Sequence, residues 1–135
     1  MSAAVPPGGM ASLDEAGLRR FLDHFYAKVR RDEAIGPLFE RVIGPEWGPH
    51  LDRIQDFWSS VMLKTGRYDG NPLAVHRRIE GLEPAMFDRW LELFEQSARE
   101  VLTPALAEAF RAKAHLIADS LRLGLYFMPA RQPAA

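Results

Sequence analysis

Residues 57–76 read FWSSVMLKTGRYDGNPLAVH. A bulky apolar segment runs into a loop, and the Gly-Asn-Pro sequence at 70–72 is a strong helix breaker. His76 follows on a short apolar segment, and His50 opens the helix on the other side. This order predicts two helices that are joined by a loop and carry one histidine each.

The residues around His50 indicate what the two histidines do. Ile54 and Trp58 stand four and eight positions further on, so they share its helix face, which is otherwise apolar. Two imidazoles that face each other across an apolar gap can hold an iron porphyrin, because one ligates the metal and the other lies near the opposite face. We assign His24 and His115 the ordinary role of a single histidine, at the surface or satisfied in the core.

Apolar residues recur at helical spacing along the rest of the chain. Ser12 and Glu15 match a capping box, which predicts a helix over residues 13–31. The Gly-Pro pairs at 44–45 and 48–49 are expected to bracket a loop. Further helices are expected to begin near Leu38, at His50, over residues 73–79 up to Gly81, at Pro84, and at Thr103-Pro104.

No segment alternates with period two, so the chain is predicted to be all-α. We expect one domain over residues 12–128. The Ala/Pro/Gly-rich ends, residues 1–11 and 129–135, are predicted to be disordered tails.

Composition excludes several classes of function. The chain has 135 residues and a net charge of −1, which gives no electrostatic reason to expect a nucleic acid partner. It has no cysteine, which excludes thiol catalysis, Cys-bound metals and covalent haem attachment. No signal peptide is evident, and no apolar run approaches the roughly 20 residues that cross a bilayer. We therefore expect a cytoplasmic protein with no membrane partner.

Several blocks resemble the group III truncated haemoglobins, in the same order along the chain. They are residues 25–30, 35–39, 47–50, 57–76 and 87–94, and the likeness extends over roughly residues 20–127. The Gly-Gly pairs that mark the helix junctions of other truncated globins are missing here, which agrees with group III. The resemblance implies a truncated globin fold, with shortened globin helices packed around a pocket for non-covalent haem b (iron protoporphyrin IX).

The resemblance also implies roles for individual residues. His76 matches the iron ligand, whose second ring nitrogen would donate to a backbone carbonyl, and His50 matches the distal histidine. Tyr26 and Trp90 match the distal polar residues that hydrogen-bond ligands on the iron in this family. The other residues expected to line the haem pocket are Phe39, Ile54, Trp58, Leu73, Phe94 and Ile117.

Two arginines and one glutamate complete this comparison. Arg77 or Arg78, next to the iron ligand, either pairs with a haem propionate or is simply exposed. Glu80 stands before Gly81 where members of the family often have proline, which would change how the short helix ends and leave the ligand in place.

Three classes of function remain open at this point. We expect a haem protein that reversibly binds O2, CO, NO or a similar small ligand. The alternative is an NO dioxygenase or peroxidase-like enzyme, which would need an external reductase because no electron-delivering domain is attached. A cofactor-free helical interaction module would require His50, Tyr26 and Trp90 to be packing residues. Two histidines plus a carboxylate could also bind non-haem iron, but nothing in the sequence identifies the carboxylate.

Overall fold

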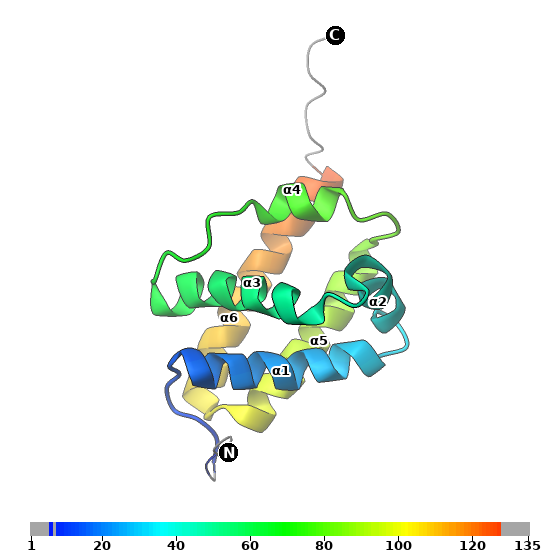
Figure 1. Ribbon diagram of the computed structural model, residues 1–135. Coiled ribbons are helices and arrows are strands. Elements are labelled where there is room, and N and C mark those ends of the chain that lie inside the picture. Colours follow the sequence, from blue (N-terminus) through cyan, green and yellow to red (C-terminus); the bar gives the residue numbers. More distant parts are fainter. Residues whose placement is uncertain (1–5, 7, 128–135) are drawn as a thin grey trace.

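The computed structural model describes residues 6 and 8–127. Within these ranges every regular element is helical, which confirms the all-α prediction (Figure 1). The elements are α1 (Glu15–Arg31), α2 (Gly36–Ile43), α3 (Trp47–Trp58), the π-helical turn η1 (Ser59–Leu63), α4 (Pro72–Arg77), α5 (Pro84–Val101), α6 (Pro104–Arg122) and the π-helical turn η2 (Leu123–Phe127). None of the described helices is both long and apolar enough to cross a membrane.

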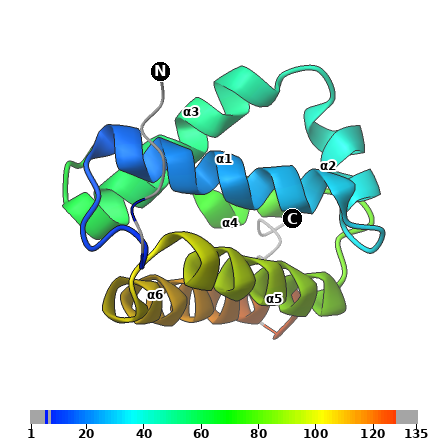
Figure 2. The same ribbon diagram turned by 90° about the horizontal axis from the view of Figure 1, so that it is seen from below.

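The helices pack in two layers. Figure 2 shows α5 and α6 side by side on one face, with α1 and α3 on the other. Phe21 of α1 joins the layers, because its ring packs edge-on against Phe94 at 5.4 Å and against Phe110 at 5.3 Å between centroids. All three rings are fully buried, and such T-shaped pairs add to the free energy gained by burying their area.

The short helix α4 lies apart from these layers, near the C-terminal end of α6 (Figure 1). The Asn71 side chain caps it by accepting a hydrogen bond from the Ala74 N–H at 3.1 Å, and Pro72 occupies the first turn. Both residues belong to the helix-breaking sequence at 70–72, and here they begin α4, while the preceding helical turn has already ended at Leu63.

Two helices begin elsewhere than predicted. The capping box at Ser12 is wrong, because Asp14 caps α1 by accepting from Gly17 N–H at 2.8 Å. The start of α3 at His50 is also wrong, since the helix begins at Trp47. Pro49 is tolerated in its first turn, where its missing N–H has no helical partner to lose.

The predicted N-terminal tail is docked at its described end. Met10 is buried, its N–H donates to Val101 O at 2.8 Å, and its carbonyl accepts from Thr103 N–H at 3.0 Å. Gly9 is required beside it, because a Cβ there would lie 2.5 Å from the Leu102 carbonyl carbon. The prediction of a tail through residue 11 is thus corrected for residues 8–10, while most of that tail and all of 129–135 lie outside the described residues.

Candidate functional site

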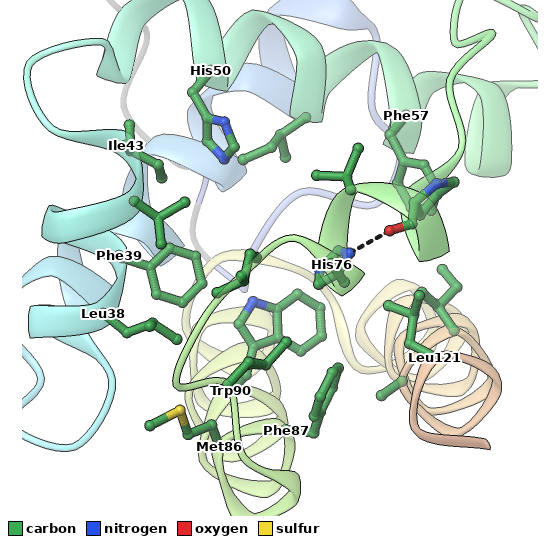
Figure 3. A pocket seen from close by; sticks show the side chains of 18 of the residues that line it. Leu38, Phe39, Ile43, His50, Phe57, His76, Met86, Phe87, Trp90 and Leu121 are labelled. Atoms are coloured by element: carbon green, nitrogen blue, oxygen red, sulfur yellow. Dashed lines mark hydrogen bonds between the residues drawn. The ribbon is translucent and has the colours of Figure 1, made fainter. Parts of the chain in front are cut away.

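A cavity of about 290 Å³ lies between α3, α4 and the α5–α6 layer. Its wall is mostly aliphatic and aromatic, and Figure 3 shows side chains converging on it from several helices. Eight of the predicted site residues line it: His76, His50, Tyr26, Trp90, Phe39, Ile54, Trp58 and Ile117. An apolar cavity with a few polar groups is the usual form of a binding site for a small molecule or cofactor.

His76 reaches the cavity from the last turn of α4. Its Nδ1 lies 2.6 Å from the Pro72 carbonyl oxygen, one helical turn earlier (Figure 3). A carbonyl oxygen only accepts hydrogen bonds, so the proton is on Nδ1 and the neutral ring keeps a free electron pair on Nε2. The backbone of α4 therefore fixes the tautomer that a metal ligand needs.

His50 reaches the same cavity from α3 (Figure 3). Burial lowers the pKa of its imidazole, and the positive charge of Arg53 and the neighbouring His76 lower it further. The ring is therefore neutral at pH 7. Because a neutral imidazole has one donor and one acceptor nitrogen, His50 can give or take a hydrogen bond in the cavity.

Tyr26 and Trp90 bring two N–H or O–H donors to the cavity wall. Tyr26 is buried among aromatic rings, with Phe25 at 4.6 Å and Trp47 at 6.0 Å between centroids. Burial raises the pKa of its phenol to about 12, and a contact with Trp90 offsets only part of this rise. The phenol therefore keeps its proton, and with it the ability to donate, across the ordinary pH range.

Two predicted lining residues do not line the cavity. Phe94 is fully buried one layer behind it, where its ring stacks on Trp90 at 5.1 Å and on Trp58 at 5.2 Å. Leu73 packs instead over Gly124 of η2, close enough that a Cβ on Gly124 would lie 2.8 Å from it. The family resemblance implied that both residues line the pocket, but it could not say which neighbour each would meet in this chain.

Arg77 and Arg78 do not line the cavity, and their exposure is one of the two arrangements that the sequence left open. Arg77 is exposed and donates to the Gly124 carbonyl at 3.3 Å, and Arg78 is exposed beside it. The arginine that lines the cavity is Arg53. It stands three positions after His50 and shares that histidine's helix face, so the prediction that this face is otherwise apolar was wrong.

The remaining lining residues were not among the predicted site residues. They are Ile35, Leu38, Val42, Ile43, Phe57, Tyr68, Pro72, Val75, Ile79, Leu82, Met86, Phe87, Ala118 and Leu121. Most belong to short elements and loops, where a periodic pattern is too brief to define a face.

The donor set fits a flat apolar cofactor better than a bare metal ion. Within the described part of the chain, no three His, Asp or Glu side chains come together in a way that could hold a metal ion. The cavity instead offers one imidazole with a fixed tautomer, a second imidazole and a wall of apolar side chains. A porphyrin supplies four of its metal's ligands itself and needs this combination from the protein.

Comparisons with known proteins agree on one family. A curated relative, the group 3 truncated hemoglobin ctb of Campylobacter jejuni, is 31% identical over 118 residues, which are 85% of this chain and 93% of that protein. The crystal structure of the group III truncated hemoglobin from Campylobacter jejuni superposes with a TM-score of 0.84 at 29% identity. That alignment covers 91% of this chain and 99% of the other. No family model matches the sequence.

Proposed function

The chain belongs to the group III truncated haemoglobins, and from that membership we propose that it binds haem b non-covalently in the cavity, with His76 as the iron ligand. The observation that carries the proposal is the hydrogen bond from His76 Nδ1 to the Pro72 carbonyl, 2.6 Å long, which leaves Nε2 free at an apolar cavity. Haem, when bound, supplies an iron with a sixth coordination position that can take a small gas molecule.

The polar residues of the cavity then determine which ligand is held and for how long. Tyr26 O–H and Trp90 N–H would be the hydrogen-bond donors for a polar diatomic ligand such as O2 held in the cavity. The neutral His50 is a third possible donor or a side chain that screens the cavity from water. The function that this arrangement supports is reversible binding of O2, CO or NO.

The charged groups near the cavity are available to hold the haem propionates. Arg53 lines the cavity itself, and Arg77 and Arg78 are exposed next to the iron ligand. Arginine suits this role because its guanidinium pairs with carboxylates in a two-pronged geometry. Arg53 is therefore a third candidate for this role beside Arg77 and Arg78.

The ultraviolet–visible spectrum of the purified protein with added hemin tests the proposal. A Soret band that sharpens on reduction and shifts with CO is expected, and His76→Ala should lose it. His24→Ala is the matched control, because His24 is exposed and lies 2.9 Å from the Glu100 carboxylate, away from the cavity. A colourless wild type, or His76→Ala with an unchanged spectrum, would refute haem ligation by His76.

Kinetics on the same preparation separate binding from turnover. Reversible binding predicts that O2 and CO bind and leave without net consumption. Steady consumption of NO, or of peroxide, with an added electron donor would instead move the conclusion to an NO dioxygenase or peroxidase-like enzyme with an external reductase.

A further inference from the structure

The helix that carries His76 is too short to hold its own direction. α4 contains six residues, and isolated helices of this length are unstable in water because nucleation is costly. The direction of the His76 imidazole must therefore be set by what packs against α4. The structure places η2, at the end of α6, against it (Figure 1).

The closest of these contacts joins Leu73 of α4 to Gly124 of η2. A Cβ built on Gly124 would lie 2.8 Å and 2.9 Å from the two terminal methyl carbons of Leu73. The Gly124 backbone does not have a positive φ, so any residue could adopt its conformation. What Gly124 supplies is space, and Leu73 fills that space.

Two hydrogen bonds join the same pair of segments. Arg77, which follows His76, donates to the Gly124 carbonyl at 3.3 Å. Tyr126 O–H donates to the Leu82 carbonyl at 2.9 Å, in the loop that leaves α4. Both hydrogen bonds lie on the C-terminal side of His76, and the apolar contact with Leu73 lies on its N-terminal side.

Aromatic rings complete the contact beneath the imidazole. The Tyr126 ring packs edge-on against Phe87 at 6.3 Å, and the Phe87 ring lies 6.4 Å from the His76 ring. A shift of η2 would therefore reach His76 through this ring and through Leu73.

We propose that Gly124 and Leu73 form a positioning contact that sets the direction of His76 toward the haem iron. The proposal rests on the proposed function, since it needs His76 to be the ligand. Neither residue lines the cavity, so they act through α4. Their contact determines how firmly the imidazole is held and how readily haem is lost.

Gly124→Ala tests this contact, because the new methyl group would push Leu73 and α4 outward. We expect haem transfer to an acceptor apoprotein to become about tenfold faster. The iron–histidine stretching frequency in the resonance Raman spectrum of the reduced, ligand-free protein should also shift. Gly48→Ala is the matched control, since a Cβ at Gly48 in α3 meets nothing within 4 Å.

The double variant Gly124→Ala/Leu73→Ala separates positioning from general damage. If the clash with Leu73 is the cause, removing the Leu73 side chain should return the stretching frequency toward that of wild type, giving a non-additive cycle. Leu73→Ala alone removes the contact without any clash and should also speed haem loss. An unchanged stretching frequency and haem-loss rate in Gly124→Ala would overturn the proposal. A shift in that frequency that persists in the double variant would also overturn it.

Hydrogen exchange of the haem-free protein distinguishes this failure from failure of the proposed function. Amides of residues 73–82 should exchange faster in Gly124→Ala than in Gly48→Ala, because the contact with η2 holds them. This result does not depend on haem. Should His76→Ala keep its haem, the proposed function fails, while equal exchange in both glycine variants would mean that η2 does not hold α4.

Discussion

The hydroxyl group of Tyr26 is a single buried donor whose removal changes little else. Its ring packs against Phe25, Phe39 and Trp47, and Tyr26→Phe keeps all of these contacts. Because a hydrogen bond to a charged acceptor is lost, the O2 dissociation rate should rise roughly ten- to hundredfold. Stopped-flow displacement of O2 by CO measures this rate.

The raised pKa of Tyr26 supplies the control for that experiment. With a pKa of about 12, the phenol stays protonated, so the ratio of the variant and wild-type rates should be constant from about pH 6 to pH 10. A ratio of one would remove Tyr26 as a donor, and a ratio that collapses near pH 10 would mean that the phenol ionises far earlier.

His50 is expected to titrate below its ordinary pKa and to open the cavity when it does. Burial and the charge of Arg53 disfavour the imidazolium, so protonation should drive the ring toward water. The CO association rate should therefore rise only as the pH falls below the ordinary histidine pKa of about 6.5. Flash photolysis across this range measures it, and His50→Leu should abolish the dependence. A pH profile that survives in His50→Leu would assign the effect to another group.

Sequence reasoning at the residue scale succeeded where a residue type and a motif coincided. His76, His50, Tyr26 and Trp90 stand in blocks that resemble the family, and all four line one cavity. It missed Arg53 because an arginine on a helix is usually solvent-exposed. The side chain is indeed exposed, and only the helical register places it at the cavity.

At the scale of elements, the junction between α1 and α2 depends on Gly36. A Cβ there would lie 2.9 Å from the Arg30 carbonyl oxygen and 3.0 Å from that of Val29. These are backbone atoms that cannot rotate away, so Gly36→Ala should lower the free energy of unfolding by about 1–3 kcal/mol. Urea denaturation with an unchanged m-value measures this loss.

Gly48→Ala again serves as the comparison, since its Cβ meets open space inside α3. Alanine is the better helix former, so this variant should gain about 0.5 kcal/mol. Equal effects of the two substitutions would show that the close approach at Gly36 is relieved without cost.

The long helices were predictable because their apolar stripes repeat over many turns. α5 and α6 begin at Pro84 and Pro104, next to the signals that the sequence displays. The short elements were not predictable in detail. Two N-cap candidates, Ser12 and Asp14, precede α1, and local spacing cannot rank them. The six residues of α4 are too few to define a helix face. The family resemblance alone therefore decided the prediction for Leu73, which implied a place at the cavity and not against Gly124.

At the scale of the whole molecule, the ion pair between Asp32 and Arg89 helps to join the two layers. Asp32 after α1 accepts from two nitrogens of Arg89 in α5, at 2.6 Å and 2.9 Å, and from the Ala34 and Ile35 N–H groups at 3.0 Å each. Its side chain is 6% exposed. Arg89 and these bonds lower the pKa of the Asp32 carboxyl.

Asp32→Asn should therefore destabilise the protein by about 2 kcal/mol at pH 7. A carboxyl group whose pKa is lower in the folded state stabilises the folded protein at pH values above its unfolded pKa, which is near 4. This stabilisation is lost as the pH falls through the pKa of the folded state. The difference in the free energy of unfolding between Asp32→Asn and wild type should become smaller below about pH 4. Urea denaturation at several pH values measures it, and a constant gap would show that the charge is irrelevant.

Asp23→Asn provides the surface control for this pair. Asp23 accepts from Arg19 at 3.1 Å with its side chain 55% exposed, so its loss should cost less than about 1 kcal/mol. Contacts such as Asp32–Arg89 and Met10–Leu102 join residues far apart in the chain. No local sequence pattern predicts such long-range contacts. The helices could therefore be predicted from the sequence, and the contacts between them could not.

The positions of the tryptophans mean that their fluorescence should report whether haem is bound. All three of its indoles are at the cavity: Trp58 and Trp90 line it, and Trp47 packs against the lining residues Phe39 and His50. A porphyrin bound there would quench the fluorescence of all three tryptophans. Ultraviolet emission should thus be bright in the apoprotein, fall almost to zero as hemin is titrated in, and return in step with each haem that escapes.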